Sequence, residues 1–288
     1  MASSGDTRSW GTVFNLVAKA YDRHRPAYPD RLVDQACDSA GLVSGNRVLE
    51  IGCGTGQLTH SLLARGLRVT AIEPGQLLIS RARERLAGAG NVEFLNASLE
   101  EASVPHRDFR AAFSASAIHW VDPAVGWQKL ADALPGAGCL ALFSYFGLDD
   151  PRSRSDQEAL RAALGKVAPK LLEDWPSYRG LDALCTGAAD RCNNVSEVWA
   201  WLGSYDVARN YVSELFDPAV LTALPIALEH TADELNAVLG TMSFWARLSP
   251  RQRDALMSET HDLQQRLGRP IRSSAAACLV TATVRELA

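Results

Sequence analysis

The sequence of 288 residues is 47% hydrophobic and 22% charged, a composition typical of a soluble globular protein with room for one large domain. Its formal net charge of -4 favours no nucleic-acid partner, and it has neither the N-terminal apolar segment of a signal peptide nor a stretch long enough to span a bilayer. Because its six cysteines and six histidines show no metal-ligand or disulfide spacing, we predict a cytoplasmic protein with reduced thiols, no bound metal, and no membrane or nucleic-acid partner.

The first predicted elements are helices that precede any strand. Residues 10–44 indicate one helix that ends near Asp22 and a second that begins at Asp30, separated by the proline-punctuated turn RHRPAYP. Since both helices come before the first strand, we interpret residues 1–44 as an N-terminal helical cap.

Short apolar runs alternate with amphipathic segments between residues 45 and 147. The predicted strands are 47–52, 68–73, 91–96, 111–116 and 139–145. The predicted helices between them are 57–66, 76–88 and 123–134. This alternation predicts a mostly parallel sheet with helices on both faces, which binds ligands at the carboxyl ends of its strands.

The pattern changes after the fifth predicted strand. Residues 148–222 have mixed helical character, which indicates an inserted helical cap for substrate binding. Its aromatic residues either line an apolar acceptor pocket or fill the core of the cap itself, and they are Trp175, Tyr178, Trp199, Trp201, Tyr205, Tyr211 and Phe216. Residues 223–288 predict helices over 231–248 and 249–268, between two strands that complete a doubly wound, seven-stranded α/β sheet. These last two strands are 223–231 and 275–284.

A glycine-rich loop follows the first predicted strand, in the segment EIGCGTGQLTH at residues 50–60. Where a strand is followed by G-x-G-x-G and then by a helix, the backbone N–H groups of the loop point toward a ligand at the start of the helix. The loop lacks the G-K-[ST] of a P-loop, and its third glycine comes one residue too early for a dinucleotide fingerprint. Glu50 would repel a pyrophosphate, whereas Glu73, at the end of the second strand, can accept hydrogen bonds from ribose hydroxyls. The pattern therefore predicts that the ligand of this loop is a nucleoside with a cationic, phosphate-free tail.

This pattern resembles the class I S-adenosylmethionine-dependent methyltransferases, whose first motif has the form VLEIGCGTG, residues 48–56 here. The resemblance covers residues 45–147 and implies a Rossmann-like, cofactor-binding core with S-adenosylmethionine as cofactor and S-adenosylhomocysteine as product. Two further stretches are similar to the small-molecule methyltransferases related to trans-aconitate methyltransferases. They are Tyr21-x-x-x-Arg25-Pro26-x-Tyr28-Pro29 and Ala117-x-His119-Trp120-x-Asp122.

The resemblance also implies a set of cofactor-binding residues. They are Gly52, Gly54 and Gly56, where the backbone approaches the ligand; Glu50, Ser114, Tyr21 and Arg25 near the methionine part; and Glu73, Pro74, Ser98 and Leu99 around the ribose and adenine. Arg25 would pair with the cofactor carboxylate. Many relatives have an acid where Ser98 stands, so recognition of the adenine amino group would rely here on backbone or water.

His119 is the candidate catalytic residue, because it follows the fourth strand at the edge where the cofactor is expected. It is either a general base, needed only if the acceptor must lose a proton, or a structural histidine beside Trp120. The predicted function is methyl transfer to a small-molecule acceptor, with secondary metabolism as one setting. Two alternatives stay open: an enzyme that uses the cofactor otherwise, by cyclising its aminobutyl portion or by a rearrangement, and a non-catalytic cofactor-binding subunit. The sequence does not identify the acceptor, its reacting atom (O, N or C) or the oligomeric state.

Overall fold

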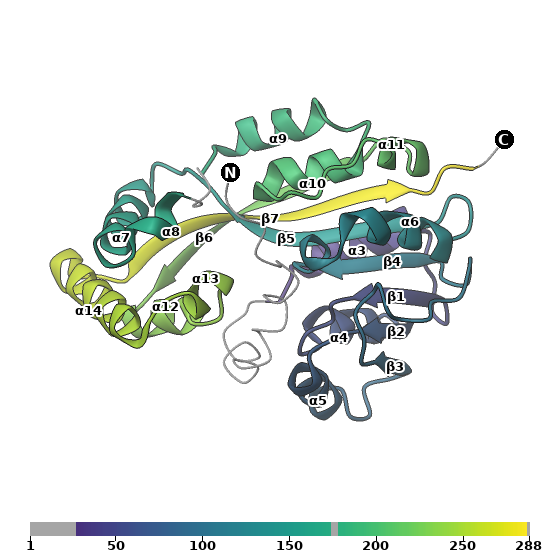
Figure 1. The fold of residues 1–288 in the computed structure, drawn as a ribbon, viewed down its shortest axis with the longest axis horizontal. Coiled ribbons are helices and arrows are strands. Elements are labelled where there is room, and N and C mark those ends of the chain that lie inside the picture. Colours follow the sequence, from purple (N-terminus) through teal and green to yellow (C-terminus); the bar gives the residue numbers. More distant parts are fainter. Residues whose placement is uncertain (1–26, 174–177, 287–288) are drawn as a thin grey trace.

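Seven strands form one sheet in the residues that this computed structural model describes, 27–173 and 178–286 (Figure 1). The strands are β1 (Arg47–Ile51), β2 (Arg68–Ile72), β3 (Val92–Leu95), β4 (Ala111–Ala115), β5 (Cys139–Gly147), β6 (Val220–His230) and β7 (Ile271–Thr283). Their order across the sheet is β3-β2-β1-β4-β5-β7-β6. The first five run parallel to one another, whereas β7 pairs antiparallel with both β5 and β6. The predicted mostly parallel, seven-stranded sheet is therefore confirmed.

Helices connect the strands and cover the sheet. They are α3 (Asp30–Ser39), α4 (Gln57–Ala64), α5 (Gln76–Arg85), α6 (Pro123–Ala133), α7 (Arg154–Val167), α8 (Pro169–Glu173), α9 (Leu181–Ala189), α10 (Val195–Gly203), α11 (Val212–Leu215), α12 (Ala232–Leu239), α13 (Ser243–Ala246) and α14 (Pro250–Leu267). A short 3-10 helix, Ile118–Trp120, follows β4. The helix predicted to end near Asp22 lies outside the described residues.

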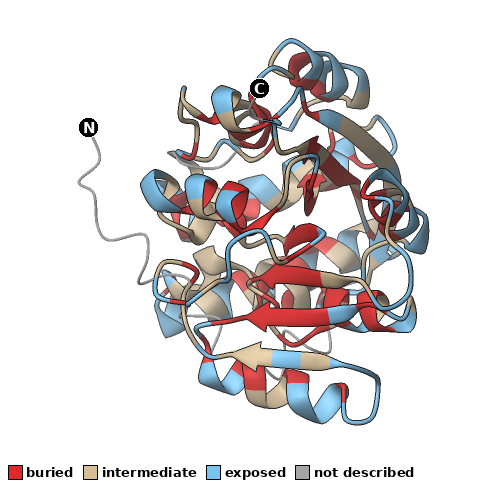
Figure 2. Cartoon of the chain, turned by 90° about the vertical axis from the view of Figure 1, so that its right-hand side faces the viewer, coloured by how far each residue is buried: buried red, intermediate tan, exposed pale blue. Residues whose placement is uncertain are grey.

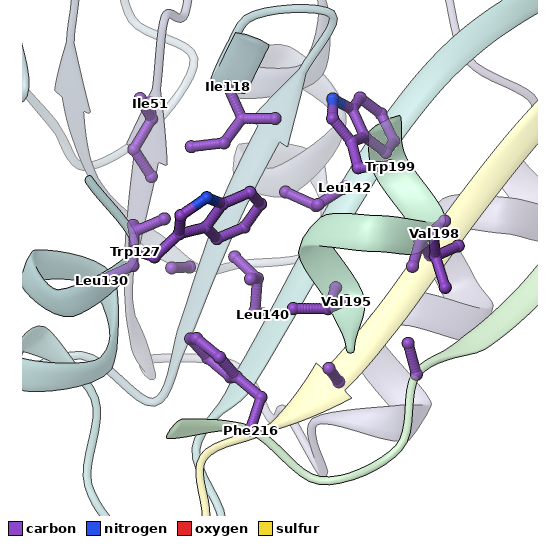
Figure 3. Close-up of a cluster of buried hydrophobic side chains, with 14 of the residues drawn as sticks. Ile51, Ile118, Trp127, Leu130, Leu140, Leu142, Val195, Val198, Trp199 and Phe216 are labelled. Carbon is purple, nitrogen blue, oxygen red and sulfur yellow. The ribbon is translucent and has the colours of Figure 1, made fainter. Parts of the chain in front are cut away.

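Both faces of the sheet are buried at its central strands, where successive residues point to opposite sides. In β5, Leu142 belongs to one apolar cluster and Phe143 to the other. Trp127 of α6 and Trp199 of α10 pack in the first cluster (Figure 3), while α3 and α4 supply the second. Figure 2 shows the same layering, with buried strands inside and exposed surfaces on the outer helices. Covering both faces leaves the strand ends as the places where a ligand can reach the sheet.

A separate group of helices gathers where β6 and β7 extend past the parallel strands (Figure 1). Helices α7, α8, α12 and α14 contribute to one buried cluster, which consists of Ala163, Leu164, Ala168, Leu171, Leu235, Leu239, Leu248, Leu256, Leu263 and Ile271. This cluster joins helices inserted between β5 and β6 with helices inserted between β6 and β7. Two distant segments of the chain therefore build the cap at the carboxyl ends of the strands.

The prediction of one continuous helix over 231–248 is wrong. Helix α12 ends at Leu239, and α13 begins at Ser243. Glycine is unfavourable inside a helix, and Gly240 takes the C-cap position. The Thr241 hydroxyl then donates to the carbonyl of Val238 at 2.6 Å, which satisfies one of the terminal acceptors of α12. The break matters for the site, because the residues that follow it line a cavity.

Candidate active site

A cavity of about 550 Å³ lies at the carboxyl ends of the parallel strands. We call one side the cofactor end, made of residues that end or follow β1, β2 and β3: Ile51, Gly52, Gly54, Ile72, Glu73, Pro74, Leu78, Ser98, Leu99 and Glu100. We call the opposite side the cap wall, made of Leu171, Tyr178, Arg179, Leu184, Leu202, Gly203, Ser204, Tyr205, Met242, Ser243, Phe244 and Arg247. The ends of β4 and β5 lie between the two sides. Strands β2, which Glu73 follows, and β5, which Gly147 ends, are three positions apart in the sheet, a separation of about 14 Å across the strands.

The three glycines of the loop serve different purposes. Gly52 and Gly54 line the cavity, whereas Gly56 does not. A Cβ on Gly52 would lie 2.3 Å from the Cβ of Ala117, so this position must be small to let the loop after β4 pack against it. A Cβ on Gly56 would lie 2.9 Å from Leu86, and the residue has a φ of +85° at the start of α4. Gly54 is therefore the glycine whose place fits the predicted approach of backbone to ligand.

Glu73 is held at the cofactor end by the backbone of two loops. It is 5% exposed, its Oε2 accepts from the Gly54 N–H at 3.1 Å, and its Oε1 accepts from the Gly75 N–H at 2.8 Å. Burial raises the pKa of this carboxyl, and the two backbone hydrogen bonds oppose that rise. A fixed, partly satisfied carboxylate at this point can accept further hydrogen bonds from a diol such as ribose.

Glu50 and Ser114 are predicted cofactor residues that do not line the cavity in this structure. Glu50 is 1% exposed, and its Oε2 accepts from the Thr59 hydroxyl at 2.7 Å, while its buried Oε1 has no hydrogen-bond partner among the described residues. Burial raises the Glu50 pKa to about 7, against the Thr59 hydrogen bond and with a smaller contribution from Glu73. Ser114 is fully buried and donates to the carbonyl of Ile51 at 3.2 Å. Their predicted contacts with the cofactor stay predictions.

The adenine side of the predicted site combines apolar residues with a local hydrogen-bonded pair and one further glutamate. Pro74 and the buried Leu99 line the cofactor end, and their contacts with the adenine stay predictions. The Ser98 hydroxyl donates to Glu101 at 3.1 Å and accepts from the Glu101 N–H at 3.3 Å, so its hydrogen-bonding capacity is used within its own loop. Glu100, which the sequence analysis did not single out, also lines this end.

His119 lies in the 3-10 helix after β4 and lines the cavity between its two sides. Its ring stacks on Tyr205 with centroids 4.0 Å apart and planes 3° from parallel, and Trp120 lies against it at 4.9 Å. Tyr205 follows α10, where Ser204 has a φ of +55° and a Cβ on Gly203 would lie 2.0 Å from the tyrosine ring. The sequence gives no sign that these two rings meet, because the residues are 86 positions apart in the chain.

A row of hydroxyl groups beside the end of β4 was also missed from sequence. The Tyr28 hydroxyl lies 2.8 Å from Ser116 Oγ, which lies 3.0 Å from Ser144 Oγ. Ser116 and Ser144 line the cavity, and Tyr28 stacks on Tyr145 at 5.1 Å. Their position at strand ends was the available signal, since the carboxyl ends of parallel strands meet at one edge.

The aromatic residues of segment 148–222 divide between pocket and core. Tyr178 and Tyr205 line the cavity. Trp199 and Phe216 are almost fully buried in the cluster beneath α10, which is the core role. Trp175 lies outside the described residues.

Two further predicted residues, Tyr21 and Arg25, lie outside the described residues, and their contact with the cofactor carboxylate stays a prediction. Within the described parts of the chain, no three His, Cys, Asp or Glu side chains come together as a metal site would require. Helices long and apolar enough to cross a membrane are likewise absent from those parts.

Comparison with known proteins identifies the central part of the chain. Residues 48–135 match the model of a family described as a methyltransferase domain. An uncharacterized methyltransferase of Mycobacterium tuberculosis is 34% identical over 135 residues, which make up 47% of this chain and 53% of that relative. The chain thus spans about half the length of that relative, and the family match over residues 48–135 includes the glycine loop.

Solved structures share the fold over most of the chain. An S-adenosylmethionine-dependent methyltransferase from Thiobacillus denitrificans, in complex with S-adenosylhomocysteine, has a TM-score of 0.52 and 18% identity, covering 93% of this chain and 97% of that one. The YcgJ protein from Bacillus subtilis has a TM-score of 0.52 and 14% identity, covering 89% and 99%. At these identities the likeness concerns the fold alone. Residues 48–135 therefore match a methyltransferase domain, and the chain as a whole shares its Rossmann-like fold with the solved structure of an S-adenosylmethionine-dependent methyltransferase.

Proposed function

We propose that the chain is an S-adenosylmethionine-dependent methyltransferase that transfers a methyl group to a small-molecule acceptor and releases S-adenosylhomocysteine. One observation carries the proposal: a single cavity joins the Glu73 carboxylate at one side to a wall of cap helices at the other. An acceptor that reaches the cofactor must share this cavity of about 550 Å³ with it, which favours a small molecule over a protein or nucleic-acid chain.

The side chains at the cofactor end suit S-adenosylmethionine better than a phosphorylated nucleotide. Glu73 and Glu100 line it, and no lysine or arginine lines this end among the described residues. Such a surface repels phosphate and accepts a ligand with net positive charge in its tail. When bound, this cofactor supplies an electrophilic methyl group on a sulfonium.

The chain itself contributes positioning and exclusion of water. Trp120 and Tyr205 lie against His119, which fixes its ring plane between the two sides of the cavity. We assign to His119 the role of accepting the acceptor's proton where the reacting group is a hydroxyl or an amine. We also propose a narrower relationship to the trans-aconitate methyltransferases, which rests on the two motifs that contain Tyr28 and His119. A setting in secondary metabolism is part of the same proposal.

Product analysis tests the proposal. The purified protein is first titrated with S-adenosylmethionine in a calorimeter and then incubated with it and a panel of small hydroxylated, amino and carboxylic compounds. Formation of S-adenosylhomocysteine, absent from a Gly54→Val control, is the expected result. Methylthioadenosine in its place would indicate attack elsewhere on the sulfonium, and failure to bind the cofactor at all would contradict the assignment of the site.

A further inference from the structure

The cap wall has an unusual charge balance for a surface that faces a polar cofactor. Most of its side chains are apolar or aromatic, among them Leu184, Leu202, Tyr205 and Phe244. Its charged members are two arginines, Arg179 and Arg247, and no carboxylate lines it among the residues described. The carboxylates that line the cavity, Glu73 and Glu100, both belong to the cofactor end. The cavity is thus acidic at one side, and at the other it is apolar with cationic residues.

Arg179 is a half-buried cation held in a fixed place without a carboxylate partner in the described chain. Its backbone pairs with Leu148, directly after β5, and its carbonyl accepts from the Asp149 N–H at 3.0 Å. Its guanidinium carbon lies 3.9 Å from the centre of the Trp201 indole, and its NH1 donates to the Trp201 carbonyl at 3.0 Å. A guanidinium has five N–H donors in a rigid fork, so this single hydrogen bond leaves most of them for a ligand.

Trp201 is itself fixed by the helix before it, which makes the guanidinium a rigid feature. A Cβ on Gly187 would lie 2.3 Å from the indole, so α9 and α10 approach closely at this point. The indole Nε1 donates to the carbonyl of Leu184 at 3.4 Å. Arg191 also packs over this indole, at 4.3 Å, but Arg191 does not line the cavity. The protein therefore holds two arginines on one tryptophan, of which one lines the cavity.

The aromatic part of the cavity offers flat surfaces. The Tyr178 ring crosses the end of β5 so closely that a Cβ on Gly147 would lie 2.4 Å from it. Tyr205 stacks on His119, and Trp120 lies at the other edge of that pair. Flat rings of this kind stack well on a planar ligand, whereas they are poor partners for a small molecule with several charges.

We infer that the methyl acceptor is a planar, largely apolar molecule with a carboxylate that binds the Arg179 guanidinium. The inference rests on the proposed function, and it names the class of acceptor for the same cavity. The carboxylate supplies the counter-charge that Arg179 lacks in the described chain, and the rings of the cap wall cover the apolar body of the acceptor.

Binding of two probes with the same ring system tests the inference without turnover. The protein saturated with S-adenosylhomocysteine is titrated with naphthoate, which carries a carboxylate, and with naphthamide, which does not. The wild-type protein should bind naphthoate at least about tenfold more tightly. Arg179→Gln should reduce this preference to about twofold or less, Arg179→Lys should keep part of it, and Arg191→Gln should leave it intact. Tricarballylate, an aliphatic tricarboxylate, should bind more weakly than naphthoate.

The outcomes separate this inference from the proposed function. Absence of S-adenosylhomocysteine binding would overturn the proposed function, whatever the probes do. Normal binding of S-adenosylhomocysteine with no preference for naphthoate would overturn the inference alone, as would failure of naphthoate to bind. An equal loss of preference in Arg191→Gln would also overturn the inference, since the preference would then depend on the packing around Trp201 and not on a contact of Arg179 with the carboxylate. Tighter binding of tricarballylate would overturn the apolar part of the inference.

Discussion

Replacing Glu50 with glutamine should raise the free energy of unfolding above that of wild type by more at pH 8 than at pH 5. Glu50 is 1% exposed, and burial raises its pKa from 4.5 to about 7 in the folded protein. In the unfolded chain the carboxyl returns to its ordinary pKa. Between these two values the folded state holds a proton that the unfolded state has lost, so rising pH favours unfolding. The destabilisation caused by ionised Glu50 is absent below pH 4.5 and complete above about pH 7.

The size of the effect follows from the shift of the pKa. One unit corresponds to about 1.36 kcal/mol, so a change from 4.5 to about 7 corresponds to about 3 kcal/mol over the whole range. Most of it, about 2.5 kcal/mol, is expected between pH 5 and pH 8. Glutamine cannot ionise, and its amide oxygen can still accept from the Thr59 hydroxyl. Any cost of burying the unpaired amide N–H is the same at both pH values and cancels in the comparison.

Urea unfolding of wild type and Glu50→Gln at pH 5 and pH 8 measures this difference. The free energy of unfolding of the variant, relative to wild type, should rise by about 2.5 kcal/mol between the two pH values. Glu93→Gln is the matched control, because it makes the same chemical change at an exposed position of β3. A gain for Glu50→Gln that is equal at both pH values would refute the reasoning, since it would mean that the Glu50 carboxyl does not retain its proton on folding.

Three further substitutions test the site. Gly54→Val should abolish binding of S-adenosylmethionine, because it places a branched side chain at the cavity. Gly268→Val is its control, at a similar φ of +63° and with nothing within 4 Å of its Cβ, and it should lose comparable stability but keep binding. Glu73→Ala should weaken S-adenosylmethionine and S-adenosylhomocysteine alike by about 1–3 kcal/mol in calorimetry, and a loss confined to one ligand would contradict the ribose assignment. His119→Asn should leave cofactor affinity unchanged and lower turnover about 10²- to 10⁴-fold across pH 6 to 9, whereas near-normal turnover would remove the general-base role.

The sheet and the cofactor end could be predicted closely from the sequence, because local patterns determine both. The strands predicted at 47–52 and 68–73 are observed at Arg47–Ile51 and Arg68–Ile72. Each is a short apolar run that ends at a glycine or an acid, and parallel strands bring such ends together at one edge. Glu73 therefore reaches the cavity simply by following β2.

Roles within the glycine loop could not be predicted, because they depend on what each missing side chain would contact. The motif presents three equivalent glycines, yet Gly52 makes room for Ala117, and Gly56 makes room for Leu86. Likewise, a carboxylate one residue before the end of β1 gives no sign of whether it faces the cavity, and Glu50 in fact hydrogen-bonds to Thr59 of α4. Contacts between elements decided each case, and a sequence pattern does not contain them.

The cap wall could not be predicted from the sequence, because it depends on packing between two separate insertions. Leu171 and Phe244 line the same cavity only because α7 and α8 pack against α12 and α14 in a common cluster. That cluster joins two insertions into the sheet, and the break after α12 that places Phe244 there interrupts an apparently continuous helical pattern. The cofactor end, by contrast, is built from loops of neighbouring strands. Under the proposed function, substitutions on the cap wall should therefore change which acceptor is bound while Gly54 and Glu73 keep the cofactor in place, and in this way one core could serve different acceptors.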